Sequence, residues 1–273
     1  MSPARPRVLY LSSWAIGPGG QGEISFLHEQ IEEMAGAVDA LFLEPRFASW
    51  HRWALLRLRG RDREEGARVW GGGVREIRVS LPRFSSRVTG RGLLEEVAAA
   101  GPALAARLRE AGAVPDLVHA NVTFPAGLWA RGLLLSLGVP YLLQEHQAPF
   151  EKQSGKDPGG ERLRAVMGGA AEVVAVGEDL AGRMRPFLPP GREVRIVPEM
   201  VRTDLFRPAP RREFRAPLRL VSVGGLVERK GYEDLMRAVA ALRSSGLPCE
   251  ARILGEGPDR ARLEGIRRDL GLE

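Results

Sequence analysis

Cysteine is almost absent from this sequence of 273 residues. Cys249 is the one cysteine, so no disulfide can form within a single chain, which fits a reducing compartment. Long apolar runs are also missing: the sequence has no stretch of 18 apolar residues, and its start lacks the apolar core of a secretory signal. From these absences we expect a cytoplasmic protein.

Several common catalytic motifs are missing too. The sequence contains no G-x-x-x-x-G-K-[ST] phosphate loop, no G-x-S-x-G nucleophile elbow and no H-E-x-x-H helix. Its four histidines are scattered along the chain, so their spacing predicts no metal site. No expected strand carries a pair of stacking aromatic residues, so we expect no nucleic-acid partner.

Lysine is scarce, because only three of the 40 basic residues are lysines: Lys152, Lys156 and Lys230. The net charge of +6 and the pI of about 10.2 favour anionic partners, such as nucleotide sugars, anionic lipid headgroups or nucleic acid. The alternative cause of this surplus of positive charge is the arginine-rich codon usage of a GC-rich genome. In so arginine-rich a chain, a lysine within a motif stands out from the background.

Short apolar segments alternate with helical patterns along nearly the whole chain. This alternation predicts an α/β fold with parallel sheets covered on both faces, whose ligands bind at the carboxyl ends of the strands. A proline- and arginine-rich stretch, residues 202–217, predicts a linker between a seven-strand domain, residues 1–201, and a second domain, residues 218–273. Since the second stretch holds only two βα units, we expect an incomplete domain. The expected strands are residues 8–11, 40–43, 77–81, 117–120, 141–144, 173–176, 194–197, 218–223 and 249–254, and the expected helices are residues 21–34, 93–111, 125–137, 162–168, 180–187, 232–244 and 259–270.

One segment, residues 218–239, has the pattern of an anion-binding turn. An apolar strand breaks at Gly224 and Gly225, and a short basic loop with Arg229 and Lys230 leads into an amphipathic helix. The backbone N–H groups and the dipole at a helix N-terminus attract a phosphate, and Lys230 adds a full charge. The pattern therefore predicts a diphosphate site, with an ordinary βα unit and an exposed basic loop as the alternative.

A glycine-rich loop follows the first expected strand. Gly17, Gly19 and Gly22 form G-x-G-x-x-G, and Glu44 lies 22 residues beyond Gly22, as in dinucleotide-binding folds. Five residues separate the strand from Gly17, however, whereas the dinucleotide turn follows its strand directly. The loop leaves an NAD-dependent or epimerase-type enzyme open as an alternative.

Polar residues follow two of the expected strands. Glu145 and His146 come directly after residues 141–144, at the edge of an α/β sheet where chemistry takes place. A local hydrogen-bonded pair of these two side chains, capping the loop, is the alternative. His119 lies near the end of the preceding strand, and we interpret it as structural.

Residues 44–73 interleave tryptophans with arginines. Trp50, Trp53 and Trp70 lie among seven arginines, which suits a membrane interface or an anionic acceptor. On a helical wheel the tryptophans and leucines spread all round, which favours a partly ordered, solvated loop-helix insertion. Peripheral contact with the inner face of a membrane stays open.

In their order and spacing, these motifs resemble the GT-B glycosyltransferases of the GT4 type. Residues 218–231 resemble the V-G-R-L-x-x-x-K-G opening of that family's C-terminal, donor-binding domain, and residues 254–258 resemble its next strand end. The P-G-G loop with Gly19 and Gly20 resembles the N-terminal loop that contacts the donor diphosphate. Residues 144–146 resemble the T-E-H strand end, whose histidine lies beside the transferred sugar.

The match to this family departs at several positions. Gly225 stands where the family usually has an arginine that pairs with the lysine on the donor diphosphate, and Arg229 is a candidate substitute. Asn121 replaces the second histidine of the D-x-V-H-x-H strand end. Glu199 replaces the asparagine of the I-P-N-G-V-D hinge, so we expect the hinge backbone to differ.

The resemblance implies a GT-B-like fold, with an N-terminal Rossmann-like domain on the acceptor side and a partial Rossmann-like domain that binds the nucleotide sugar. It implies a retaining, metal-independent transfer of a hexose from a nucleotide sugar to a saccharide or lipid-linked acceptor, with no cofactor. The family's E-x7-E segment is missing before the chain ends at Glu273, so we expect a truncated chain with little activity of its own. A non-catalytic module that binds an acceptor or a membrane is the remaining alternative. The implied roles are catalysis for His146, donor-diphosphate binding for Gly19, Gly20, Arg229 and Lys230, and acceptor contacts for Gln21 and Glu145.

Overall fold

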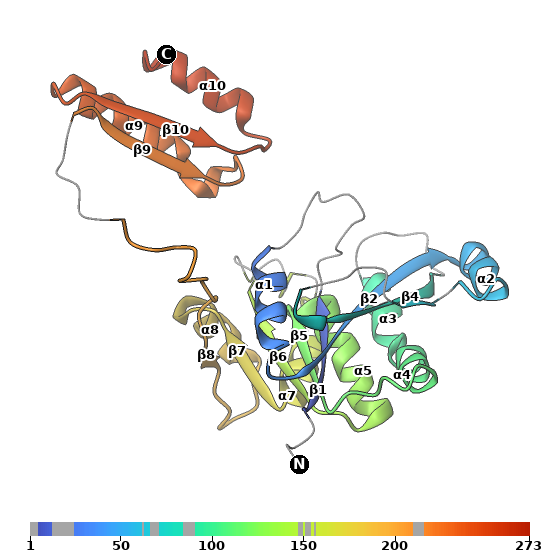
Figure 1. The fold of residues 1–273 in the computed structure, drawn as a ribbon. Coiled ribbons are helices and arrows are strands. Elements are labelled where there is room, and N and C mark those ends of the chain that lie inside the picture. The colour runs from blue at the N-terminus through green and yellow to red at the C-terminus, as the bar shows by residue number, and fades with distance from the viewer. Residues whose placement is uncertain are drawn as a thin grey trace. The chain divides into compact units, whose positions relative to one another are not determined.

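The computed structural model describes residues 5–12, 25–61, 63–65, 71–83, 91–146, 150, 154–155, 157–209 and 216–273. The chain divides into two compact units, unit 1 (Met1–Arg202) and unit 2 (Thr203–Glu273), both drawn in Figure 1. No helix within these described ranges is long and apolar enough to cross a membrane.

Unit 1 is built on a sheet whose described strands number eight, in the order β3-β4-β2-β1-β5-β6-β7-β8. Neighbouring strands run parallel, except that β3 runs antiparallel to β4. The central strands are buried along nearly their whole length, as expected of parallel strands covered on both faces. The strands are β1 (Arg7–Ser12), β2 (Asp39–Ser49), β3 (Arg63–Glu65), β4 (Arg75–Arg83), β5 (Leu117–Asn121), β6 (Tyr141–Glu145), β7 (Glu172–Ala175) and β8 (Arg195–Ile196).

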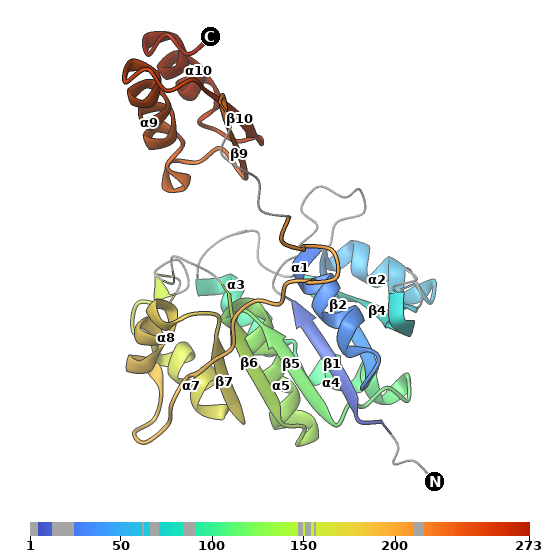
Figure 2. The same cartoon turned by 60° about the vertical axis from the view of Figure 1, so that its left-hand side comes forward.

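Helices pack on both faces of this sheet, as Figure 2 shows. Tyr10 of β1 packs with Leu27 and Ile31 of the first helix on one face. Leu9, the preceding residue, points to the other face and joins the larger core that includes Leu104. This alternation follows from the two-residue period of a strand. The helices are α1 (Ser25–Met34), α2 (Trp50–Leu58), α3 (Arg91–Ala99), α4 (Gly101–Glu110), α5 (Leu128–Leu137), α7 (Glu161–Gly169) and α8 (Glu178–Met184).

The single helix expected over residues 93–111 is wrong, because α3 and α4 are separate helices with a break at Ala100. Gly101 opens α4 at its contact with α5. A side-chain carbon on Gly101 would lie 2.6 Å from the Cα of Gly132 in α5, so the two helices approach each other at a pair of glycines. Pro102, in the first turn of α4, suits a helix start.

Two further helices differ from the expected bounds. A π-type turn occupies Thr123–Gly127, and α5 begins at Leu128 rather than at residue 125. Helix α8 ends at Met184, and a short 3-10 turn (Arg185–Phe187) completes the expected helix. That turn contains a proline, which cannot donate the backbone hydrogen bond of a continuing α-helix.

The segment rich in tryptophan and arginine holds more regular structure than its sequence pattern predicted. Strand β2 continues to Ser49, six residues beyond the expected end at Leu43, and α2 follows it directly. Strand β3 adds an eighth strand where seven were expected. Its sequence, Arg63–Glu65, is charged rather than apolar, because β3 lies at the edge of the sheet.

Unit 2 contains a two-stranded parallel sheet of β9 (Leu218–Val223) and β10 (Cys249–Leu254). A short 3-10 turn, η4 (Glu228–Lys230), leads into α9 (Tyr232–Ser244), and α10 (Arg260–Asp269) follows β10. The expected bounds of both strands and of α9 are confirmed. The core of unit 2 is formed by Leu226, Tyr232 and Leu263, while Val221, Val223 and Leu254 are exposed.

Candidate functional site

The carboxyl ends of β1, β5 and β6 meet at one edge of the unit 1 sheet. Ser12 pairs with Asn121, which in turn pairs with Gln144. Glu145 ends β6 and His146 follows it directly. The polar residues expected from the strand ends therefore lie where open α/β sheets bind their ligands.

His146 has a hydrogen-bond partner at each ring nitrogen. Its Nδ1 bonds the Oε1 of Glu199, and its Nε2 lies 3.0 Å from the Oδ1 of Asn121. The Nδ2 of Asn121 donates to the carbonyl oxygen of Leu11 at 3.3 Å, which turns its Oδ1 toward the ring. Both nitrogens therefore face side-chain oxygen atoms. The side chain of His146 is 3% exposed and that of Glu199 is 35% exposed.

Glu145 is fully buried, with 0% of its surface exposed. Its Oε2 accepts hydrogen bonds from the backbone N–H of Thr123 at 2.9 Å and from the Thr123 hydroxyl at 2.6 Å. Its Oε1 accepts a bond from the backbone N–H of His146 at 3.1 Å. Glu145 thus ties the turn after β5 to the end of β6. This burial favours a supporting role, and the acceptor contact expected from its sequence position stays a prediction.

The turn after β5 is strained at Val122. This buried, β-branched residue has a φ of 74°, in the region that L-residues rarely adopt. Such a conformation costs roughly 1–3 kcal/mol and is found mostly at functional sites. The Val122 N–H donates to the carbonyl of Gln144 at 2.8 Å, so the turn is tied to β6 and brings Thr123 to Glu145.

The acid of the dinucleotide pattern, Glu44, is engaged within the sheet. It is 5% exposed and lies inside β2, not at its carboxyl end. Arg78 Nε lies 3.0 Å from the carboxyl group of Glu44 and 2.9 Å from that of Glu76. Because a ribose hydroxyl would need that carboxyl group, the ion pair weighs against the NAD interpretation of the glycine loop.

His119 packs inside the site as a structural residue. Its Nε2 donates to the Oε1 of Gln144 at 2.9 Å, and its ring lies 5.3 Å from that of Tyr10. Burial lowers the pKa of His119 from 6.5 to about 4, the hydrogen bond to Gln144 opposes the shift, and the charge of His146 adds to it. The ring is therefore neutral at pH 7.

This shift predicts a pH-dependent loss of stability. The unfolded chain binds a proton at His119 below pH 6.5, whereas the folded chain binds one only near pH 4. Stability should therefore fall by about 3 kcal/mol as the pH drops from 6.5 to 4. His119→Gln keeps a donor toward Gln144 but cannot titrate. In urea titrations at several pH values, the wild-type chain should lose more stability than this variant, and parallel curves would contradict the prediction.

In unit 2 the expected basic loop lies at the carboxyl end of the β9 strand. Arg229 and Lys230 are exposed in η4, and Gly231, with a φ of 67°, links this turn to α9. That backbone conformation favours glycine. Gly257 lets the loop after β10 approach closely, because a side-chain carbon there would lie 2.3 Å from the carbonyl oxygen of Leu226.

Two cations of the basic loop in unit 2 are available to bind an anion. Among the residues that the structure describes, Arg229 and Lys230 have no ion-pair partner. Glu233, in the first turn of α9, is occupied by Arg237 at 2.7 Å and Arg262 at 2.6 Å. The hydrogen bond from Arg237, followed by that from Arg262, lowers the pKa of Glu233. Arg229 and Lys230 therefore lie beside the positive end of the α9 dipole, together with the acidic residues Glu228 and Asp234.

The predicted site residues fall into three groups. Gly19, Gly20 and Gln21 lie outside the described residues. Glu145 and His146 lie together in unit 1, and the basic residues of η4 lie in unit 2. The roles predicted for all of them stay predictions. Within the described part of the chain, no group of three or more His, Cys, Asp or Glu residues is placed to hold a metal ion.

Asn121, Thr123 and Glu199 were missed as site residues. The sequence held one signal for two of them, because Asn121 and Glu199 stand at positions where the GT4-type motifs have other residues. No sequence pattern pointed to Thr123, because its role depends on the strained turn at Val122 that precedes it.

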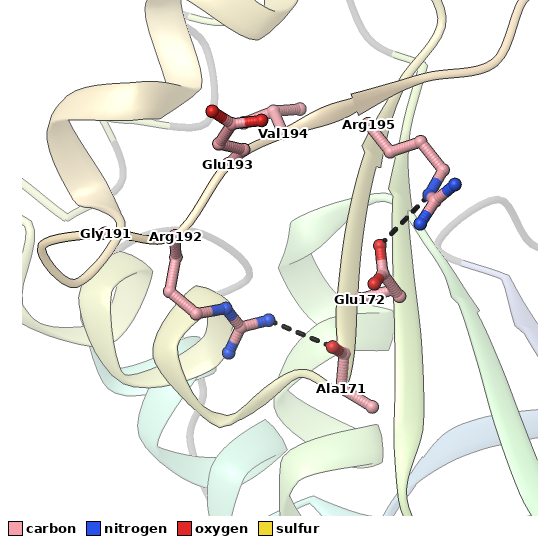
Figure 3. Close-up of a pocket in the computed structure, with 7 residues that line it drawn as sticks. All are labelled: Ala171, Glu172, Gly191, Arg192, Glu193, Val194 and Arg195. Atoms are coloured by element: carbon pink, nitrogen blue, oxygen red, sulfur yellow. Dashed lines mark hydrogen bonds and ion pairs between the residues drawn. The ribbon is translucent and has the colours of Figure 1, made fainter.

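A pocket of about 540 Å³ lies elsewhere on unit 1, between the start of β7 and the segment that leads into β8 (Figure 3). Its guanidinium groups are already engaged: Arg192 donates to the carbonyls of Ala170 and Ala171, and Arg195 pairs with Glu172 at 3.2 Å. The pocket lies at the amino-terminal edge of the sheet, opposite to the edge where α/β folds bind ligands. It is therefore not the candidate site.

Residues 27–199 match the family described as "Glycosyl transferase 4-like domain". Among curated proteins, the chain is 28% identical over 223 residues to the 2-deoxystreptamine glucosyltransferase of Streptomyces kanamyceticus. That match covers 73% of this chain and 57% of the glucosyltransferase.

Two solved structures have a similar fold. Anabaena HepE in complex with UDP and glucose is 16% identical, with a TM-score of 0.58, over 98% of this chain and 67% of HepE. The lipopolysaccharide outer core galactosyltransferase WaaB is 14% identical, with a TM-score of 0.56, over 98% of this chain and 66% of WaaB. These likenesses confirm the expected α/β fold of the GT-B type. The chain spans 57% to 67% of the length of these three relatives.

Proposed function

We propose that this chain, which belongs to the glycosyl transferase 4-like family, moves a hexose from a nucleotide sugar to a saccharide or lipid-linked acceptor. The observation that carries the proposal is the basic turn of unit 2, where Arg229 and Lys230 are exposed at the start of α9. The similar HepE structure, which holds UDP and glucose, supports a uridine nucleotide as one donor to test.

On the donor side, the leaving group is a nucleoside diphosphate. Cleavage of the sugar–phosphate bond builds negative charge on that diphosphate and positive charge on the sugar ring. Lys230, Arg229 and the amides at the start of α9 would stabilise the diphosphate, because preorganised donors aimed at developing charge lower the barrier. The loop amides at Gly19 and Gly20 would add further donors by resemblance to the family.

We assign His146 the role of a hydrogen-bond donor to the sugar, not that of a general base. Both ring nitrogens already face side-chain oxygens, which favours hydrogen bonding over proton abstraction. A sugar hydroxyl would take the place of Asn121 as the acceptor at Nε2. Glu199, on the other nitrogen, would act as the positioning residue that orients the ring.

By resemblance to the family, transfer would proceed with retention at the anomeric carbon and without a metal. The nucleotide sugar would be a substrate, and no cofactor would take part. Gln21 and the residues around it would contact the acceptor. The rival class, an NAD-dependent enzyme, would instead bind a nicotinamide dinucleotide at the glycine loop.

Calorimetric titration of the 273-residue chain separates these two classes. The ligands are UDP-, ADP- and GDP-linked hexoses, with NAD as the competing class. We expect at least one nucleotide sugar to bind and its affinity to fall with salt, since the diphosphate contact is electrostatic. Binding of NAD with no binding of any nucleotide sugar would overturn the proposed function.

A further inference from the structure

Helix α2 lies at the tip of an extension of the unit 1 sheet (Figure 1). Strand β1 pairs with β2 only as far as Leu43, whereas β2 continues to Ser49 beside β4. The helix follows the carboxyl end of β2, so it emerges at the same edge of the sheet as the candidate site. This extension gives α2 contacts with β2 and β4 on one side.

The side of α2 that faces the sheet is partly buried. Trp53 donates its indole N–H to the carbonyl oxygen of Ser80 in β4 at 3.1 Å. Leu56 is also partly buried, and Arg57 lies over the Trp53 ring at 5.4 Å. No residue of α2 is fully buried, so this anchor occupies only one side of the helix.

The opposite side of α2 is exposed and carries three large apolar side chains, with His51 among them. Trp50 is 51% exposed, Leu55 is 51% exposed and Leu58 is 86% exposed. At 100° per residue these three side chains fall within an arc of about 140°, away from Trp53 and Leu56. The sequence alone suggested an even spread round the helix, and the structure separates the anchoring tryptophan from this outward stripe.

Arginines border the outward stripe and lack acidic partners. Arg57 lies on one side of it, and Arg52 and Arg59 lie on the other. Residues 50–61 contain four arginines and no Asp or Glu. In the part of the chain that the structure describes, none of the four makes an ion pair. By contrast, surface arginines of α8 and α9 pair with acids one turn away.

We propose that the outward face of α2 binds an anionic lipid bilayer. An exposed tryptophan with two leucines, bordered by arginines, is the pattern of a helix that lies in the membrane interface. The unpaired guanidinium groups complement anionic headgroups. Leu55 and Leu58 favour lipid over nucleic acid, because aliphatic side chains neither stack on bases nor bond phosphates. The proposal goes beyond the proposed transferase activity and does not depend on it.

Vesicle flotation with the 273-residue chain tests this proposal without nucleotide sugar or acceptor. We expect binding to vesicles of phosphatidylcholine with phosphatidylglycerol, weak binding to phosphatidylcholine alone, and a loss of binding at high salt. Leu55→Ser with Leu58→Ser should weaken binding at least about tenfold. Arg52→Gln with Arg59→Gln should weaken it about 10- to 30-fold, at about fivefold for each arginine.

Matched control variants come from other exposed surfaces. Leu135→Ser changes a leucine of α5 that is 70% exposed, and Arg267→Gln with Arg268→Gln removes two exposed arginines of α10. Both should leave vesicle binding within about twofold of wild type. No flotation, or an equal loss in the control variants, would overturn the proposal. Binding of a single-stranded oligonucleotide through the α2 arginines, without vesicle binding, would also overturn it.

Discussion

Glu145→Ala is expected to lower the free energy of unfolding by about 3–5 kcal/mol. The substitution leaves the N–H and the hydroxyl of Thr123 without the acceptor that both use, inside a fully buried site. It also removes the acceptor of the His146 N–H and opens a cavity at the end of β6. Urea titration of the chain at pH 7 measures the change.

Two control variants distinguish the loss of these buried hydrogen bonds from the effect of removing a negative charge. Glu145→Gln keeps one oxygen acceptor toward Thr123, so it should be less damaging than the alanine variant. Glu172→Ala removes an exposed carboxyl group that pairs with Arg195, and should cost less than about 1 kcal/mol. If Glu145→Ala costs no more than Glu172→Ala, Glu145 does not support the turn.

Lys230→Ala is expected to weaken nucleotide-sugar binding by about 10- to 150-fold. A charge-assisted hydrogen bond to a phosphate contributes about 1.5–3 kcal/mol, which converts to that range. Arg268→Ala, which removes an exposed cation of α10, is the matched control and should change affinity little. Unchanged donor affinity in Lys230→Ala, measured by calorimetry, would show that the diphosphate assignment is wrong.

Gly225 allows a test in the opposite direction. A side-chain carbon at this position would meet only the carbonyl oxygen of Glu256, at an ordinary 3.9 Å, so the backbone accepts a Cβ atom there. Gly225→Arg should therefore raise donor affinity if the site lacks one cation. The donor affinity of Arg229→Ala shows whether Arg229 already supplies that charge. A gain from the first variant with no loss from the second would indicate a weakened donor site.

The fold was predictable where one local pattern decides the structure. Apolar runs located β1, β5 and β6, because buried parallel strands are continuously apolar. Apolar residues also located β9 and β10, although most residues of these two strands are partly or fully exposed. The charged strand Arg63–Glu65 was missed, since an edge strand needs no apolar pattern. The break between α3 and α4 was missed although Pro102 is a local signal for a helix start, and the close approach of Gly101 to Gly132 of α5 is not visible in the local sequence.

The candidate site was predictable only in part. His146 was found because it follows an apolar strand, but its partner Glu199 lies 53 residues further along the chain. Asn121 was noted as a departure from a motif, yet its contact with His146 depends on the pairing of β5 with β6. The outward stripe of α2 became visible only once the contact of Trp53 with Ser80 had fixed which side faces the sheet.

Hydrogen–deuterium exchange during titration with the best-binding nucleotide sugar tests the donor assignment most directly. Exchange of backbone amides reports where a ligand protects the chain, so it locates the diphosphate without an activity assay. The expected result is slower exchange in residues 224–235, which contain Lys230 and the start of α9. Unchanged exchange in that segment at saturating ligand, whatever happens at residues 17–22, would contradict the assignment of unit 2 as the donor-binding unit.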